Sequence, residues 1–342
     1  MPSKKTEVIE ILFERLCPEG ELQAGKRYLV TRSEVAEAIR ARNSRYPDEK
    51  AKEEEIFAKT GVKKIIQLSD GNPPNFLKDF IRKPTANKNW PAALTKKRIT
   101  GKQAYGETYV LEFVPFGQND TVPFPDRFLP FPGMPVVAVE SLSLPRAARA
   151  LGRTDEAWLS QVVVYQRIIH HHLAVISSLN VVDLSHLQMS VKTQPEIDAI
   201  FVATLLEKGV DFHALVTCEA KQLNERILED QIREQIAAGF ATTLKMPDAT
   251  KIDAIIPVAV QVVTHPVDGA NKRGVYVLEF EMVRRSEFDA KYADEKRRRE
   301  MELVPASRAF YHLHPTVSGV SDTRSAMPKP LPAEEQDGDE EE

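Results

Sequence analysis

Two acidic side chains and one lysine stand at the ends of two apolar segments in the middle of the chain. Asp198 begins the apolar part of EIDAIFVA, and Glu219 and Lys221 end the segment FHALVTCEAK. Because residues two apart in a strand point to the same face, Glu219 and Lys221 are expected to project together. If the two segments pair as a hairpin, Asp198 reaches the same place. Two carboxylates and an ammonium would then converge at the edge of a buried sheet.

This combination of groups suits metal-assisted cleavage of a phosphodiester bond. Hard divalent cations such as Mg²⁺ take oxygen ligands, usually one or two protein carboxylates together with water and phosphate. A bound cation neutralises phosphate charge and lowers the pKa of a water molecule. A nearby lysine can orient or deprotonate that water, or stabilise developing negative charge. The alternative is chance, because 28% of the residues are charged and charged strand ends are usually only solvated.

Asp198, then Glu219-Ala220-Lys221 after a short hairpin, then an amphipathic helix, resemble the motif of the PD-(D/E)XK nuclease superfamily. The resemblance covers roughly residues 155–265, and the leading proline of the motif is displaced to Pro195. It implies that Asp198 and Glu219 bind Mg²⁺, for which Mn²⁺ can substitute. It also implies that Lys221 acts on the attacking water.

Two glutamines near the motif are weaker candidates that the resemblance implies. Gln222 follows the triad directly and is assigned to the catalytic set, and Gln231 lies on the next helix, where some members carry auxiliary polar residues. Glu156, at the start of an earlier helix, could supply the extra carboxylate of some members. The simpler interpretation of Glu156 is that an acid suits a helix N-terminus.

The segments around these residues predict an α/β (α+β) domain with a restriction-endonuclease-like mixed central sheet flanked by helices. A long helix is expected from about 155 to 179, followed by a strand at 187–193 and the two strands of the motif. The stripe Leu223, Ile227, Leu228, Ile232 and Ile236 predicts a helix that covers the sheet. Two further strands are expected at 255–263 and 274–283. Together these elements define a predicted nuclease domain over residues 151–316.

Residues 1–114 predict a separate DNA-binding domain. Helical spacing over 4–17, a capping box formed by Thr31 and Glu34, and a proline-led segment at 73–83 indicate three helices. Alternating apolar residues over 98–116 indicate a β-hairpin. Three helices before a basic hairpin resemble a winged helix-turn-helix, in which the helix at 74–82 would enter the major groove. The second and third helices are too far apart for a compact motif, and a generic helical lobe is the alternative.

The charge of the chain is unevenly distributed. The formal net charge is −4 at pH 7, but the last nine residues carry seven acids and no base, so the rest of the chain is at +3. Residues 61–103 hold ten Lys or Arg and two Asp, a basic block typical of nucleic-acid binding. The residues predicted to contact DNA are Lys78, Arg82, Lys83, Lys96, Lys97, Arg98 and Lys102.

The remaining segments and the composition limit where the protein can act. Seven prolines over 115–145 predict an extended linker, taken as 115–150, and the acidic, proline-containing segment 317–342 predicts a disordered tail. No apolar run approaches the length of a membrane span, and the amphipathic N-terminus is unlike a signal peptide. Cys17 and Cys218 give no disulfide framework and no zinc spacing. A cytoplasmic protein that does not contact membranes is therefore expected.

The sequence thus favours an Mg²⁺-dependent endodeoxyribonuclease that acts on double-stranded DNA in restriction or phage defence. A homodimer is expected, because one metal site cuts one strand. A companion methyltransferase or another subunit of a defence system would fit the same setting. One alternative is a repair or recombination nuclease that acts on ends or junctions. Another is a non-catalytic DNA-binding regulator on a nuclease fold, which the intact Asp198, Glu219 and Lys221 disfavour.

Overall fold

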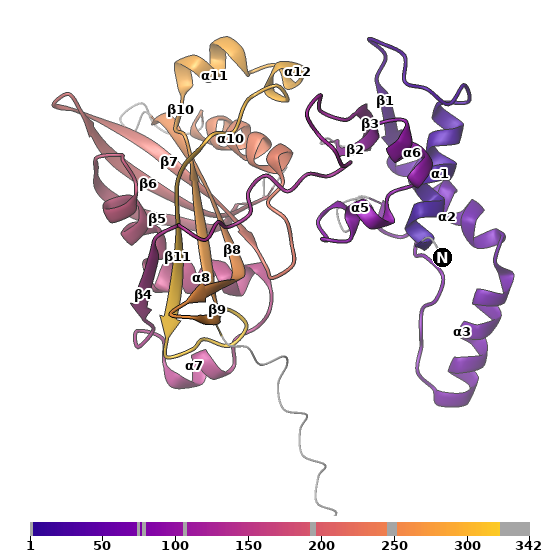
Figure 1. The fold of residues 1–342 in the computed structure, drawn as a ribbon, viewed down its shortest axis with the longest axis horizontal. Coiled ribbons are helices and arrows are strands. Elements are labelled where there is room, and N and C mark those ends of the chain that lie inside the picture. The colour runs from indigo at the N-terminus through magenta and orange to yellow at the C-terminus, as the bar shows by residue number, and fades with distance from the viewer. Residues whose placement is uncertain are drawn as a thin grey trace, which may run out of the picture.

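The computed structural model describes residues 3–73, 76, 80–104, 108–191, 196–244 and 252–321, without the side chains of 188–191. The elements form two groups, which lie side by side in Figure 1. One is built on a three-stranded sheet and the other on an eight-stranded sheet. The mixed α+β character predicted from the sequence is confirmed.

The N-terminal group packs helices on a small antiparallel sheet of order β1-β3-β2. The predicted hairpin is confirmed, because β2 and β3 pair from Ile99↔Pro115 to Gln103↔Leu111. The predicted capping box is also present, and it begins α2. The elements of this group are α1 (Lys4–Leu16), β1 (Tyr28–Thr31), α2 (Arg32–Ser44), α3 (Pro47–Thr60), α5 (Ala86–Asn89), α6 (Ala92–Lys96), β2 (Ile99–Gln103) and β3 (Tyr109–Pro115).

The second group is a mixed sheet with helices on both faces. The strand order is β4-β11-β9-β8-β7-β6-β5, with β10 beside β8. The pairs β7–β8 and β4–β11 are parallel and the other pairs are antiparallel. Its elements are β4 (Val136–Glu140), α7 (Arg146–Ala150), α8 (Glu156–Tyr165), α9 (Ile168–His171), η1 (His172–Ile176), β5 (Val181–Val191), β6 (Ile197–Glu207), β7 (Val210–Lys221), α10 (Glu229–Thr243), β8 (Ile252–Val267), β9 (Ala270–Phe280), β10 (Val283–Arg284), α11 (Arg285–Lys291), α12 (Glu295–Arg298) and β11 (Pro305–His314).

Two apolar cores lie on opposite faces of this sheet. Leu159 and Ile169 of α8 and α9 pack with Val216 of β7 in one core. Ile232 and Ile236 of α10 pack with Leu215 and Ile255 in the other. Because neighbouring residues of β7 alternate between the two cores, burial is continuous from Ala214 to Lys221. The central strands are therefore covered on both sides, and polar groups at their ends are held rigidly.

Three parts of the structure differ from the sequence-based expectation. Residues 136–140 of the predicted linker form β4, which pairs in parallel with β11 from Val136↔Phe310 to Glu140↔His314. The predicted helix 155–179 is interrupted after Tyr165, where Arg167 adopts a positive φ of 51°. Residues 317–321 of the predicted tail belong to the core, since Val317 and Val320 are fully buried. Residues 322–342 lie outside the described part of the chain.

Candidate active site

Antiparallel pairing of β6 and β7 brings three of the four predicted catalytic residues together, namely Asp198, Glu219 and Lys221. Ala199 pairs with Cys218, so Asp198 lies beside the end of β7 that carries Glu219 and Lys221. The Asp198 carboxylate accepts a hydrogen bond of 2.8 Å from the backbone N–H of Ala220. The two apolar segments therefore do pair as a hairpin, which joins Asp198 directly to the Glu219-Ala220-Lys221 segment.

The Lys221 ammonium lies at the centre of the cluster and is fully buried. It donates hydrogen bonds to Glu219 Oε1, to Glu156 Oε1 at 2.9 Å and to the carbonyl of Ala220 at 3.1 Å. All three ammonium protons can therefore be used. An ammonium held in this way is fixed in position, which a solvated strand-end lysine is not.

Helix α10 contacts Oε2 of Glu219, the carboxylate oxygen that Lys221 does not bond. Gln235 donates to Glu219 Oε2, and also to the carbonyl of Glu196 at 2.9 Å, just before β6. The predicted auxiliary residue Gln231 lies one helical turn earlier. The residue that contacts the cluster is thus Gln235, which sequence reasoning missed. The signal was present, because residues four apart on a helix share a face.

Helix α8 contributes Glu156. Of the two interpretations of this residue, an extra carboxylate of the cluster is the one that its contacts match. Asp155 caps the helix by accepting a 2.8 Å hydrogen bond from the N–H of Trp158. This cap places Glu156 in the first turn, where its carboxylate binds Lys221 and also contacts Arg82 at 3.4 Å. The predicted catalytic residue Gln222 has a different contact, because its side chain donates to the carbonyl of Asp155 at 2.7 Å. Gln222 therefore anchors α8 to the end of β7.

Burial and like charge shape the electrostatics of the cluster. Burial raises the pKa of Asp198 to about 7, and the Glu219 charge adds to this effect. Burial also raises the pKa of Glu219, and Lys221 offsets that only in part. Burial disfavours the charged form of Lys221, but the carboxylate of Glu219 prevails and raises the pKa of the lysine. The carboxylates are thus crowded, and an additional cation would relieve them.

The cluster fits a hard divalent cation by the chemistry of its donors. Within the described ranges, no three His, Cys, Asp or Glu side chains are grouped as a complete metal site. Mg²⁺ does not need such a group, since one or two carboxylates suffice when water and phosphate complete the shell. Asp198 and Glu219 provide those carboxylates. Gln235 Oε1 is a buried oxygen that accepts no hydrogen bond from any described residue, so it is a further oxygen donor beside Glu219.

The predicted DNA-contacting residues fall into four sets. Lys83 and Lys96 are exposed. Lys97 binds the carbonyl of Gly20 at 2.7 Å, Arg98 binds carbonyls of the 117–120 loop, and Lys102 lies 3.9 Å from Asp230. Arg82 is 8% exposed and faces Glu156, so it lies beside the cluster and not on an open helix surface. Lys78 and most of the predicted helix 74–82 lie outside the described residues.

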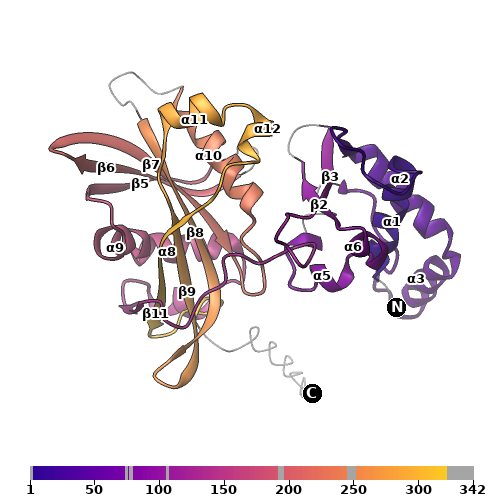
Figure 2. The ribbon, with the colours of Figure 1, turned by 45° about the horizontal axis from the view of Figure 1, so that its top comes forward.

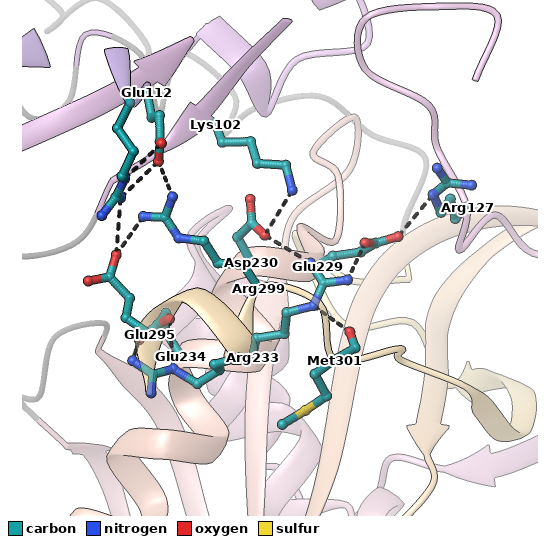
Figure 3. Close-up of polar contacts among 12 residues, drawn as sticks. Lys102, Glu112, Arg127, Glu229, Asp230, Arg233, Glu234, Glu295, Arg299 and Met301 are labelled. Carbon is teal, nitrogen blue, oxygen red and sulfur yellow. Dashed lines mark hydrogen bonds and ion pairs between the residues drawn. The ribbon is translucent and has the colours of Figure 1, made fainter. Parts of the chain in front are cut away.

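Ion pairs join the N-terminal group to the helices of the large sheet, as Figure 3 shows. The Glu112 carboxylate on β3 is buried and forms ion pairs with an arginine from each group. In Figure 2 this contact region lies where the hairpin β2–β3 faces α12. Buried charges that lose one partner cost more than exposed ones, so the pair between the buried Glu112 and Arg299 matters more than the exposed pairs. The pairs that cross between the groups are Arg299–Glu112, Arg27–Glu295 and Lys102–Asp230. Arg27–Glu112 lies within the N-terminal group, and Arg127–Glu229 joins the segment after β3 to α10.

No helix within the described ranges combines the length and apolar character needed to cross a membrane. Comparisons of the chain with protein-family models, with curated proteins and with solved structures gave no match.

Proposed function

We propose that this protein is an Mg²⁺-dependent DNA endonuclease of the PD-(D/E)XK type that acts in restriction or phage defence. The observation that carries the proposal is the buried cluster at the ends of β6 and β7. Asp198, Glu219 and Lys221 meet there, and Glu156 and Gln235 support them from two helices. The mixed sheet, with a helix following β7 and a parallel strand β8, supports the restriction-endonuclease-like fold.

Each residue of the cluster has a role that follows from its contacts. Asp198 and Glu219 would hold Mg²⁺, or Mn²⁺ in its place, and the bound ion would neutralise phosphate charge and acidify a water molecule. Lys221 is kept at a fixed point by Glu219 and Glu156, from which it can orient the attacking water or stabilise negative charge. Gln235 holds Glu219 in place, because its amide donates to Glu219 Oε2. The Asp198 carboxylate is oriented by the N–H of Ala220.

The N-terminal group supplies the surface for double-stranded DNA in this proposal. The helix α2, the sheet order β1-β3-β2 and the hairpin β2–β3 support a winged-helix-like arrangement. The exposed Lys83 and Lys96 are suited to phosphate, because an ammonium neutralises a phosphate without reading the base. Cleavage of both strands would use two copies of the single site, which favours a homodimer.

The proposal is tested by incubating the purified protein with plasmid and phage DNA, with Mg²⁺ and with EDTA. Endonuclease activity predicts nicked or linear plasmid in Mg²⁺ and intact plasmid in EDTA. Cutting confined to DNA ends or branched junctions would instead support a repair or recombination nuclease. DNA binding without any cutting in Mg²⁺ or Mn²⁺ would support a non-catalytic regulator and contradict the proposal.

Replacing Lys83 and Lys96 by Ala is expected to weaken DNA binding equally for all sequences. Each lost phosphate contact lowers the slope of log K against log salt by about 0.9, because fewer counterions are released. Binding titrations at several salt concentrations measure this slope. Lys59→Ala, an exposed lysine paired with Glu55 on α3, serves as the control. An unchanged slope in the double variant would remove these two lysines from the DNA surface.

A further inference from the structure

Arg82 connects the N-terminal group to the catalytic cluster of the other group. Its guanidinium NH1 lies 3.4 Å from Glu156 Oε1, the same oxygen that accepts the hydrogen bond from Lys221. Its neighbour Ile81 is buried in the apolar core of the N-terminal group. The backbone carbonyl of Arg82 accepts a 3.0 Å hydrogen bond from the N–H of Arg226, which follows β7. Arg82 is therefore fixed between the two groups.

The charge of Arg82 acts on the residues of the cluster. It lowers the pKa of both Glu219 and Lys221, so it lies within electrostatic range of the two groups assigned to the reaction. Arg82 is 8% exposed as a whole residue, and its Nε–H is buried without an acceptor among the described residues. A buried guanidinium that leaves one N–H unpaired is costly. This N–H is therefore a donor that none of the described residues uses.

The side chains of the cluster differ in solvent exposure. Glu219 and Lys221 are at most 1% exposed, whereas the Glu156 side chain is 31% exposed. Glu156 and the partly exposed Asp198 are therefore the carboxylates of the cluster that solvent reaches, and Arg82 lies beside Glu156. A phosphate that approaches Lys221 from the Glu156 side must pass the Arg82–Glu156 pair.

We propose that Arg82 is a phosphate-binding catalytic residue that the N-terminal DNA-binding group supplies to the nuclease site. In the DNA-free protein its guanidinium is paired with the Glu156 carboxylate. When DNA binds, the scissile phosphate replaces that carboxylate. Carboxylate and phosphate oxygens both match the planar donor fork of arginine, and a guanidinium stabilises the charge that develops on the phosphate. This inference rests on the proposed nuclease function and adds a residue to it.

The decisive experiment compares Arg82→Ala, Arg82→Lys and Arg40→Ala with the wild type. Cleavage is measured under single-turnover conditions with saturating plasmid DNA in Mg²⁺, and affinity is measured separately without metal. Arg82→Ala should lower the rate at saturating DNA by about 10²–10³-fold, the usual effect of losing one donor to the transition state. Its dissociation constant should stay within about threefold of the wild type, because one phosphate contact among several contributes little to affinity. Arg82→Lys should recover part of the rate, since it keeps the charge and loses the fork.

Arg40→Ala is the matched control, because it removes an exposed arginine of the N-terminal group that pairs with Asp70. It should leave both the affinity for DNA and the rate at saturating DNA unchanged. Guanidinium ion, added at concentrations that leave circular dichroism unchanged, should restore cutting by Arg82→Ala and not affect the wild type. A saturated rate within about threefold of the wild type for Arg82→Ala, or a defect confined to affinity, would overturn this inference alone. A wild-type protein that cuts no DNA would overturn the nuclease proposal together with it.

Discussion

Replacing Lys221 by Met is expected to lower the free energy of unfolding of the metal-free protein by about 3–5 kcal/mol. The ammonium is fully buried and bonds to Glu219 and Glu156, so its removal leaves a buried carboxylate without its cation. Methionine fills most of the space of the lysine side chain, so the decrease in the free energy of unfolding measures the missing charge and not a cavity. Urea unfolding followed by circular dichroism in EDTA measures the change.

A divalent cation should offset part of the loss in Lys221→Met. If Asp198 and Glu219 hold Mg²⁺, the ion supplies the positive charge that the variant lacks, and it stabilises the folded state by mass action. Millimolar Mg²⁺ should therefore raise the urea midpoint of the variant more than that of the wild type. Lys291→Met, which breaks an exposed pair with Glu287 on α11, is the control and should change stability far less. Wild-type stability of Lys221→Met in EDTA would contradict the described cluster.

Asp198→Asn is expected to make the metal-free protein more stable than the wild type at pH 8, by up to about 4 kcal/mol. Burial, followed by the Glu219 charge, raises the pKa of Asp198 from 3.8 to about 7 in the folded protein. Between these two values the folded state binds a proton that the unfolded state does not. Stability of the wild type therefore decreases as pH rises from about 4 to about 7. Asparagine keeps the acceptor for the N–H of Ala220 and removes this dependence.

The difference between Asp198→Asn and the wild type should consequently disappear near pH 4. Adding Mg²⁺ at pH 8 should reverse the order of stability, because only the wild type retains both carboxylates for the ion. Urea unfolding at a series of pH values, with EDTA and with Mg²⁺, covers both expectations. A difference that is constant with pH would mean that Asp198 titrates normally, and an equal response to Mg²⁺ would mean that it does not bind the ion.

The part of the site that lies on adjacent strands could be predicted from the sequence. Alternation in β6 and β7 determines which residues share a face, and a short connection makes antiparallel pairing the expected arrangement. Asp198, Glu219 and Lys221 are therefore brought together by local structure alone. The sequence indicates only the helix face on which Gln235 lies and not which residue of that face contacts the cluster, because the position of α10 along the sheet is set by packing. Gln231, one turn away, has the same apparent periodicity.

Contacts between distant segments could not be predicted in this way. Arg82 is 74 residues from Glu156 in the chain, and its position in a basic block indicated DNA as its partner instead. Strand β4 was missed because prolines surround it and its partner β11 is about 170 residues further along the chain. Parallel pairing of that kind leaves no turn signal in the sequence. Burial of residues 317–321 likewise depends on partners such as Arg149, whose carbonyl accepts from the N–H of Ser318.

The most direct test of the proposed site is plasmid cleavage in Mg²⁺ by the wild type, Glu219→Gln and Glu279→Gln. Both glutamates are 1% exposed and lie on central strands of the same sheet, but Glu279 is bonded by Ser177 and Ser307 and lies outside the cluster. Glu219→Gln should lower the cleavage rate by at least about 10³-fold and bind DNA within about threefold of the wild type, because it removes a proposed metal ligand and no proposed DNA contact. Glu279→Gln should cut at close to the wild-type rate. Equal cleavage by Glu219→Gln and the wild type would contradict the assignment of this cluster as the nuclease site.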